Sequence, residues 1–207
     1  MDDLVAGVAE ALGAAGAAFG PPPVAAPEAL WGRVYARLDA APDAAFVESI
    51  ELVYEGYLLH YRESRAIALS AGDAESRLLA GDCFYARGLR GIAARGDADA
   101  VGLLARLMAT CSWLRACGAP FSADDALWAY ATVGLVAQHG GAAPDRVAAL
   151  FDEVDATLGT LNGHDVPAVV ARAVELLGSD WPASALPWPD AAAPAAVAPA
   201  AAAPAGA

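Results

Sequence analysis

The sequence predicts an all-α protein: a single bundle of about eight helices, followed by a disordered C-terminal tail rich in alanine and proline. Apolar residues recur at steps of three and four through most of the 207 residues, which is the period of a helix face. Glycine and proline clusters separate these segments, and no stretch alternates β-branched with polar residues as a strand would. We expect three parts: residues 1–26, a helix and a proline-rich linker; 27–178, the helical domain; and 179–207, the tail.

The prolines between the first two helices define their ends. An alanine-rich amphipathic segment covers residues 2–19 and ends at Gly20 and the three prolines 21–23, because proline cannot continue a helix. The second helix is expected to begin near Pro27, since the fixed φ of proline suits a first turn.

The third and fourth helices each carry a polar residue on an apolar stripe. Their expected ranges are 43–65 and 74–95. The stripes are Phe46, Ile50, Val53, Tyr57 and His60 in the third helix, and Leu78, Asp82, Tyr85, Leu89 and Ile92 in the fourth. Residues at this spacing share one face, so we expect His60 and Asp82 to point where apolar side chains point. Gly81 and Gly88 predict a close approach to another helix, because each otherwise costs the helix about 1 kcal/mol relative to alanine.

Capping residues mark the remaining helices. Asp97 is placed to cap a fifth helix that ends near Pro120, and residues 122–125 resemble a capping box at the start of a sixth that reaches Gly140. The seventh and eighth helices are expected from Pro144 and over residues 165–177.

The character of the chain changes from about Ser179. Trp181 and Trp188 stand among repeated prolines and are followed by an alanine and proline tract. So few large apolar groups cannot form a core, and repeated proline blocks a helix, so we expect an extended, disordered tail.

Charge and composition exclude several classes of function. A net charge of −13 opposes binding to nucleic acid, which needs clustered positive charge. The chain begins Met1-Asp2-Asp3, acidic where a secretion signal is basic, and has no run of about 18 strongly apolar residues, so we expect a cytoplasmic protein without a membrane span. The three cysteines, Cys83, Cys111 and Cys117, lack the spacing of a zinc site, so we expect free thiols and no cofactor.

His60 and Asp82 are the first candidates for chemistry. If their helices are antiparallel neighbours, the two side chains can meet as an imidazole–carboxylate pair inside the bundle. Such a pair satisfies two buried polar groups, or it serves as a base with its orienting acid. No serine or cysteine nucleophile is placed beside it, because Cys83 follows Asp82 directly and so points elsewhere. We therefore favour the structural interpretation.

The segment that follows His60 carries Arg62, Glu63 and Arg65. Basic side chains at a helix C-terminus are favoured by the macrodipole, and this explanation suffices for both arginines. The alternative is a pair of arginines that faces an anion at the mouth of a cleft.

Two acidic clusters are weaker candidates. Asp124 and Asp125 stand in an expected first turn, where capping and the helix dipole explain them. A magnesium site would need a partner such as residues 152–155, which suit a solvated helix face equally well, so we expect no metal. His139 and His164 lie beside glycines at expected helix ends, where we expect them to be exposed.

Residues 52–60 (LVYEGYLLH) and 79–87 (LAGDCFYAR) resemble the helix pair of trans-polyprenyl diphosphate synthases. In that family an apolar helix ending in Leu-Ile-His runs into an Asp-Asp-x-x-Asp motif, and a later helix reads Ala-Gly-Asp-Tyr-Leu-x-Ala-Arg-Ala. The likeness covers residues 49–116 and is most specific at Ala80-Gly81-Asp82. It implies an isoprenoid-synthase-like bundle.

The chain departs from this family at its metal-binding motif. Tyr61, Arg62, Glu63 and Ser64 stand where the aspartates should follow His60. Arginine cannot ligate magnesium, and a second aspartate-rich motif has no counterpart. The chain therefore resembles the small non-catalytic subunit of heterodimeric heptaprenyl and hexaprenyl diphosphate synthases, which helps to set product length.

The resemblance implies an isoprenoid-related role without catalysis by this chain alone. The expected partner is a catalytic prenyltransferase chain, with a second copy of this chain as the other option and nucleic acid excluded. Candidate binding residues at the mouth of a prenyl-chain cavity are Tyr57, His60, Arg62, Glu63, Arg65 and Asp82. Two alternatives remain: a helical binding or scaffold module with an apolar groove, unrelated to isoprenoids, and an enzyme that uses His60 with Asp82 or Glu63.

Overall fold

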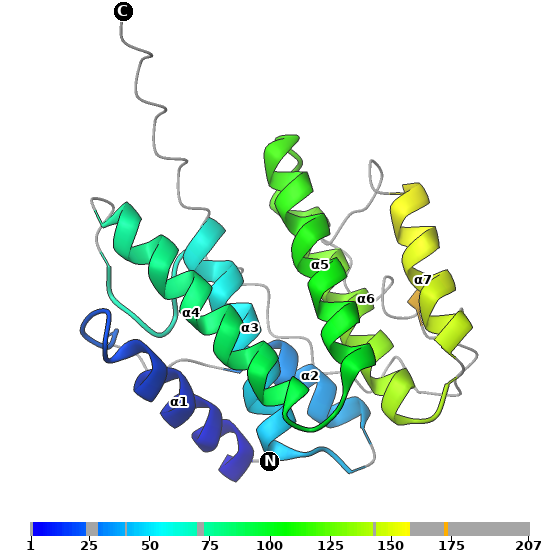
Figure 1. Ribbon diagram of the computed structural model, residues 1–207, viewed down its shortest axis with the longest axis horizontal. Helices are drawn as coiled ribbons and strands as arrows, with labels where there is room; N and C mark the ends of the chain where they lie inside the picture. The colour runs from blue at the N-terminus through cyan, green and yellow to red at the C-terminus, as the bar shows by residue number, and fades with distance from the viewer. Residues whose placement is uncertain are drawn as a thin grey trace, which may run out of the picture.

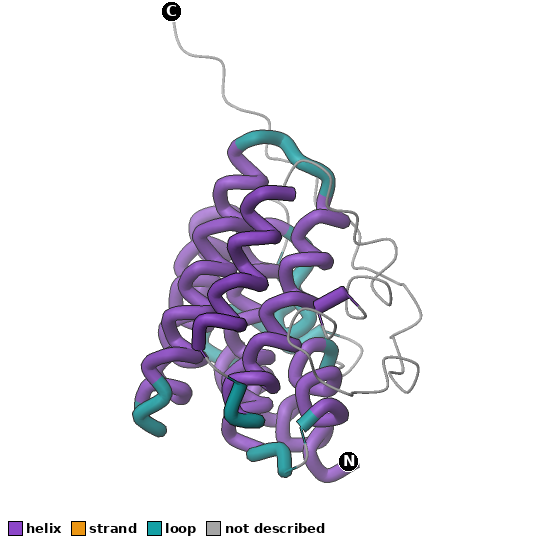
Figure 2. The backbone as a smooth tube through the Cα atoms, turned by 90° about the vertical axis from the view of Figure 1, so that its right-hand side faces the viewer, coloured by secondary structure: helices purple, strands orange, loops and turns teal. Residues whose placement is uncertain are grey.

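The computed structural model describes residues 2–23, 29–39, 41–69, 73–142, 144–157 and 172–173. These residues form seven helices and contain no strand (Figure 1 and Figure 2). The prediction of an all-α protein is therefore confirmed for the described part of the chain.

The helix bounds agree with the expected ranges within a few residues at most ends. The helices are α1 (Asp2–Gly16), α2 (Trp31–Leu38), α3 (Ala44–Tyr61), α4 (Ala74–Ala93), α5 (Ala98–Ala116), α6 (Phe121–His139) and α7 (Pro144–Thr157). The start of the second helix at Pro27, His164, the tail, and all of the eighth helix except 172–173 lie outside the described residues. The third helix is shorter than expected, because the backbone at Arg62 is extended, with φ −136° and ψ −164°.

Two aspartates cap the N-termini of helices with their side-chain carboxylates. The carboxylate of Asp97 accepts a hydrogen bond from the backbone N–H of Ala100 at 2.9 Å, as predicted, and that of Asp43 accepts from Phe46 at 3.0 Å. The capping box expected at residues 122–125 is wrong. Helix α6 already begins at Phe121 and has no side-chain cap, so these residues lie within its first turn.

Helix α3 lies at the centre of one half of the bundle. It runs antiparallel to α4 and packs against α1 and α2, while α6 joins α2 to α5 and α7 (Figure 1). Four buried aromatic side chains fill the region between α2, α3 and α6. They are Trp31, Tyr54, Tyr57 and Trp128. The two tryptophan rings are stacked with centroids 6.3 Å apart, and the ring of Tyr54 meets that of Trp128 edge-on at 4.9 Å.

Glycines allow α3 and α4 to approach closely, as predicted. A Cβ added at Gly88 would lie 2.6 Å from Cγ2 of Val53 and 2.7 Å from the carbonyl oxygen of Ser49. A Cβ added at Gly81 would lie 2.7 Å from the ring of His60. These distances leave no room for a side chain, so this contact requires the glycines.

The expected buried stripe of α4 is wrong. Its buried residues are Ala80, Gly81, Phe84, Gly88 and Ile92, of which only Ile92 belongs to that stripe. Leu78 and Leu79 are 55% and 64% exposed, and Asp82 is exposed. The glycines pack against α3 and turn the larger apolar residues sideways or outward, because the closest backbone approach decides the orientation of the helix.

Among the described residues, no helix combines the length and the apolar character that a membrane span requires.

Candidate functional site

The predicted candidate residues come from the C-terminal part of α3, the segment after it, and α4. The structure divides most of them into three sets: His60 with Asp82, Arg65 with two glutamates of α3, and Arg62 with Tyr57 and the start of α6. Glu63 joins none of the three, since it is exposed and makes no polar contact with the described residues.

His60 and Asp82 do meet. Nε2 of His60 lies 3.2 Å from Oδ1 of Asp82, which confirms the predicted contact. The pair lies at the edge of the bundle, however, because the Asp82 side chain is 68% exposed and only that of His60, at 12%, is nearly buried. The expectation of a buried aspartate is therefore wrong.

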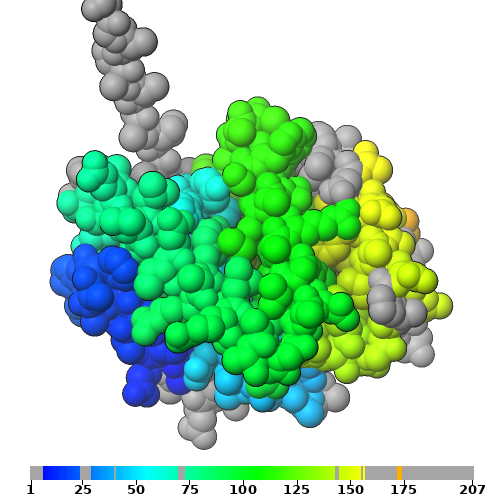
Figure 3. All heavy atoms as spheres, in the orientation of Figure 1, coloured from blue at the N-terminus to red at the C-terminus, as the bar shows by residue number. Residues whose placement is uncertain are grey.

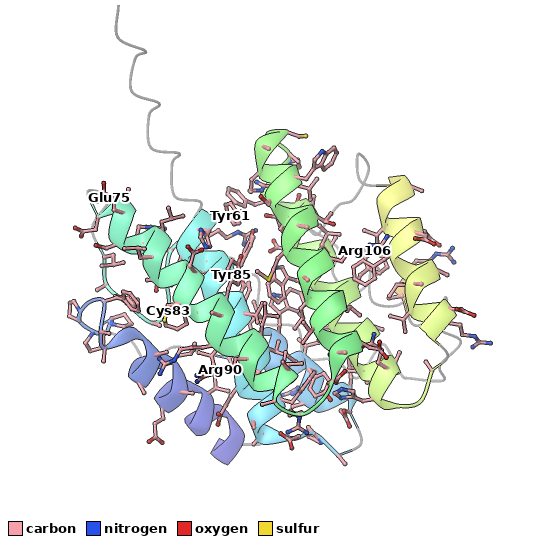
Figure 4. The ribbon with its side chains drawn as sticks, in the orientation of Figure 1. Tyr61, Glu75, Cys83, Tyr85, Arg90 and Arg106 are labelled. Atoms are coloured by element: carbon pink, nitrogen blue, oxygen red, sulfur yellow. The ribbon has the colours of Figure 1, made fainter. Side chains whose placement is uncertain are left out.

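The aromatic neighbours of His60 hold its ring in place. The ring stacks on Tyr85 with centroids 5.1 Å apart and lies against Tyr61 at 5.7 Å. Figure 4 shows Tyr61 and Tyr85 in the space between α4 and α5. Burial lowers the pKa of His60 and outweighs the opposite effect of Asp82, so the imidazole is largely neutral at pH 7.

Arg65 lies between two fully buried carboxylates. Its Nη1 is 2.8 Å from Oε2 of Glu51, its Nε is 3.0 Å from Oε2 of Glu55, and its guanidinium covers the ring of Tyr54. Burial alone would lower the pKa of Arg65, but the two glutamates outweigh it and raise that pKa. The charge is thus fully compensated within the chain.

Glu51 and Glu55 also connect three segments of backbone. Oε1 of Glu51 accepts hydrogen bonds from the N–H groups of Leu30 and Gly32 at 2.7 and 2.6 Å, and so caps α2, whose N-cap residue is a leucine. Oε1 of Glu55 accepts from the backbone N–H groups of Arg65 and Ala66 after α3. The sequence analysis missed this arrangement, although two acidic residues four apart in the apolar run of residues 50–59 are a signal for it.

Arg62 is 1% exposed and links the end of α3 to the start of α6. Its Nη2 lies 3.0 Å from Oδ1 of Asp125 and donates to the carbonyl oxygen of Phe121 at 2.9 Å. Burial opposes its charge, but Tyr57 and Asp125 outweigh burial and raise the pKa of Arg62.

The macrodipole explanation for Arg62 and Arg65 is therefore wrong, because both point back into the bundle. A cation does lie at the C-terminal end of α3, but it comes from α4: Nη2 of Arg77 donates to the carbonyl oxygen of Arg62. The alternative of an anion-facing pair at a cleft mouth is wrong as well, since both guanidinium groups are bound by carboxylates of the chain itself.

Asp124 is fully buried and lies near Arg62. It accepts a hydrogen bond from the hydroxyl of Tyr57, and its Oδ1 lies 3.0 Å from Nη2 of Arg115. Burial raises the pKa of Asp124 to about 6, against the opposing effects of Tyr57, Arg115 and Arg62. Asp124 and Asp125 thus bind other helices instead of capping their own.

Asp152 lies elsewhere, 3.3 Å from Arg106 across α5 and α7. Within the described residues, no group of three or more histidine, cysteine, aspartate or glutamate side chains is arranged to hold a metal ion.

His139 is exposed, as expected, but its ring makes contacts that the sequence analysis did not anticipate. Its Nε2 lies 2.7 Å from Oδ2 of Asp97, and its Nδ1 contacts the hydroxyl of Tyr35, which also donates to Asp39. This cluster joins the ends of α2, α5 and α6. Burial and the neighbouring Asp39 raise the pKa of Tyr35, so its hydroxyl stays protonated.

The three cysteines are free, as predicted. Cys111 is buried, Cys83 is partly buried and Cys117 is exposed. Burial raises the pKa of Cys111, which makes it an unreactive thiol.

A pocket of about 440 Å³ opens between α5, α6 and α7, away from His60. It is lined by Ala98, Asp99, Gly102, Leu103, Arg106, Gln138, Ala142, Val147, Ala148 and Phe151. Figure 4 shows Arg106 between α5 and α7, and its guanidinium covers the ring of Phe151 at 5.2 Å. The pocket lining therefore combines apolar side chains with a cation, a carboxylate and an amide.

The described polar clusters mainly join helices by paired charges. His60 with Asp82 combines a largely neutral base, a carboxylate and access to solvent, which is the minimum that a proton transfer needs. Comparisons of the chain with protein-family models, with curated proteins and with solved structures found no match.

Proposed function

We propose that this chain is a non-catalytic helical subunit of the polyprenyl-synthase type, which assists a catalytic prenyltransferase chain in isoprenoid or quinone side-chain synthesis. The proposal extends the resemblance of residues 52–60 and 79–87 to the helix pair of that family. In support, the two segments do form antiparallel helices, with His60 at the end of one and Asp82 on the other.

The observation that carries the proposal is the bonding of Arg62 and Arg65. Prenyl transfer needs metal ions to neutralise the diphosphate leaving group, and the family places the aspartates that hold them directly after this helix. Here the segment carries Arg62 and Arg65 and lacks aspartates, and Asp125, Glu51 and Glu55 already neutralise the two arginines. The ion pairs of this segment therefore hold α2, α3 and α6 together, which suits a protein that acts by contact with a partner chain.

Aromatic side chains fill the interior of the bundle, and this limits the ways in which such a subunit could act on the product. Tyr54, Tyr57 and Trp128 occupy the space beside α3 that a growing prenyl chain would need. We therefore propose that the chain modifies its partner by contact from outside and does not enclose the product between α3 and α6.

Co-expression with each prenyltransferase encoded in the source genome tests this proposal. We expect a stable complex with one of them, and a prenyl product whose length differs from that of the catalytic chain alone. The variant Arg65→Met removes the ion pairs that hold these helices together, and it should no longer change the product length. Arg37→Met, at an exposed site of α2, should still change it. Absence of any complex, together with unchanged product lengths, would refute the proposal.

The second candidate function is a helical module that binds a small ligand, unrelated to isoprenoids. The pocket between α5, α6 and α7 favours it. Gly102 lines this pocket, and an added Cβ there meets nothing within 4 Å, so Gly102→Leu should fill the pocket without disturbing the fold. Gly13→Leu on α1, where a Cβ also meets nothing, is the matched control. Native mass spectrometry of protein from its own host would then show a retained small molecule that only Gly102→Leu loses.

A further inference from the structure

The outer face of α4 is exposed and partly apolar. Figure 3 shows α4 at the surface turned to the viewer, between α1 and α5. Leu78 and Leu79 are among the most exposed large apolar side chains of the described residues, and Ala86 is also exposed. Because the opposite face packs its glycines against α3, the orientation of this helix is fixed and the leucines cannot turn inward. Exposed leucines that are held in this way suit contact with another protein.

Charges divide this face into two halves of opposite sign. Glu75 and Asp82 lie in the N-terminal half, whereas Arg87 and Arg90 lie in the C-terminal half, and all four are exposed. Glu75, Cys83 and Arg90 follow one another along α4 in Figure 4. The helix dipole favours the same distribution of charge. The distribution has a further consequence: when a second copy of the helix lies antiparallel to the first, the acidic half of each faces the basic half of the other.

We propose that a second copy of this chain binds here, with the two α4 helices antiparallel about a two-fold axis between Asp82 and Cys83. A two-fold axis at this point brings residues equally distant from it to the same level, so residues near the middle of the face meet each other across it. Asp82 and Cys83 point to opposite rims of the face, so each lies nearest to its own counterpart. Glu75 then faces Arg90 of the second copy, and Leu79 faces Ala86 of the second copy. Helical geometry places these four residues on the side opposite the buried face, whose centre is Gly81, Phe84 and Gly88.

This arrangement has the features of a closed symmetric interface. Two identical ion pairs lie at its ends and two leucines lie near its centre, so each copy presents the same surface to the other. Asp82 faces its own counterpart at one rim, where solvent screens the repulsion because its side chain is 68% exposed. We therefore infer a second copy, and not an unrelated helix, as the partner, because the two-fold axis forms the same ion pair twice and brings the two leucines to the centre.

Cys83 gives a specific readout. It is partly buried beside the axis and faces Cys83 of the second copy at the other rim. At an interaxial distance of about 8–10 Å, the two Cα atoms come near the range of about 4.4–6.8 Å in which a disulfide forms. Mild oxidation of the full chain should therefore give a covalent dimer, which Cys83→Ser abolishes and Cys117→Ser does not.

The main experiment is sedimentation equilibrium of the full chain under reducing conditions. We expect a reversible dimer whose dissociation constant rises about tenfold or more in Glu75→Arg and in Arg90→Glu, because like charges then face each other at both ends. The double variant Glu75→Arg/Arg90→Glu should recover the affinity of the wild type, since the pairs re-form with reversed sign. Leu79→Glu should also abolish the dimer, whereas Trp113→Glu, at a residue of α5 with 54% exposure, should not.

The inference stands apart from the proposed function and can fail separately. It is overturned if the wild type remains a monomer, if the double variant does not recover, or if oxidation links the copies through Cys117 alone. A monomer that binds a prenyltransferase, and loses it in Leu79→Glu, would assign the face to that partner and leave the proposed function intact.

Discussion

At the scale of single residues, burial decides what the segment after α3 does. Arg62 and Arg65 are only two and five positions beyond His60, yet their side chains leave the solvent and bind Asp125, Glu51 and Glu55. A buried charge is tolerated only with a partner, so each of these groups depends on the others. The extended backbone at Arg62 turns the following residues back toward α3 and makes these pairs possible.

Removal of the Arg65 side-chain charge should strongly destabilise the fold. Arg65→Met leaves Glu51 and Glu55 buried without their cation, and breaking such a pair costs about 3–5 kcal/mol. The free energy of unfolding from a denaturant titration at pH 7 measures the loss. The control is Arg37→Met, at an exposed site in the last turn of α2, which should cost about 1 kcal/mol or less. Equal effects of the two changes would contradict the arrangement described here.

The buried Asp124 predicts a specific dependence of stability on pH. Its pKa is raised to about 6 from an ordinary value of 3.8, so between these values the folded state holds a proton that the unfolded state releases. This carboxyl therefore contributes stability below about pH 4, and the contribution is lost as pH rises through about 6.

Asp124→Asn cannot titrate, which isolates this effect. The free energy of unfolding of Asp124→Asn relative to the wild type should rise by about 2–3 kcal/mol between pH 4 and pH 6.5, since one pKa unit corresponds to about 1.4 kcal/mol. Urea titrations of both proteins at several pH values provide the comparison. A difference that stays constant or falls with pH would show that Asp124 is ionised throughout this range.

At the scale of elements, the glycines of α4 determine which of its faces is buried. The apolar pattern favours a stripe through Leu78, Asp82 and Tyr85, but the backbone contact with α3 buries Gly81 and Gly88. Periodicity counts large apolar residues and so assigns glycine to no face. The structure shows that the closest approach of two helices has the stronger effect here, because two backbones can come that near only where side chains are absent.

Alanine at two glycines of the bundle should have opposite effects. Gly88→Ala places a methyl group 2.6 Å from Val53 and 2.7 Å from the backbone of Ser49, so α4 must move, and we expect a loss of about 1–3 kcal/mol. Gly102→Ala meets nothing within 4 Å and should stabilise α5 by up to about 1 kcal/mol through helix propensity alone. Thermal unfolding of both variants tests the pair, and a neutral Gly88→Ala would mean that the helices are farther apart than described.

At the scale of the whole molecule, paired charges and aromatic rings fill the space between α2, α3 and α6. Glu51 caps α2, Asp124 and Asp125 bind Tyr57 and Arg62, and the rings around Trp128 occupy the centre. These contacts connect α2, α3 and α6 into one rigid unit. A rigid unit with an exposed α4 is suited to act on another chain by contact.

Substitution of His60, which contacts Asp82, tests whether the chain has a catalytic role of its own. His60→Ala leaves Asp82 as an exposed carboxylate, so no buried charge loses its partner and the protein should still fold. If the proposed function is correct, the complex with the prenyltransferase and the product length should be those of the wild type. Circular dichroism checks the fold of the variant, and loss of the effect in a folded variant would favour catalysis by this pair.

The sequence by itself determined the local features of this protein. The seven helices of the described residues, the cap at Asp97 and the close approach at Gly81 and Gly88 follow from spacings within a few residues, where propensity and capping act. The contact of His60 with Asp82 could also be predicted, because antiparallel neighbours bring the two positions together once both helices are known.

Only the tertiary structure decided where the charges go. The partners of Arg62 and Arg65, the exposure of Leu79 and Asp82, and the cluster around His139 depend on residues from separate helices. An arginine at a helix end has the same local sequence whether it faces water or a buried glutamate. Its environment is set by how the helices pack, because desolvation and pairing are properties of the assembled bundle.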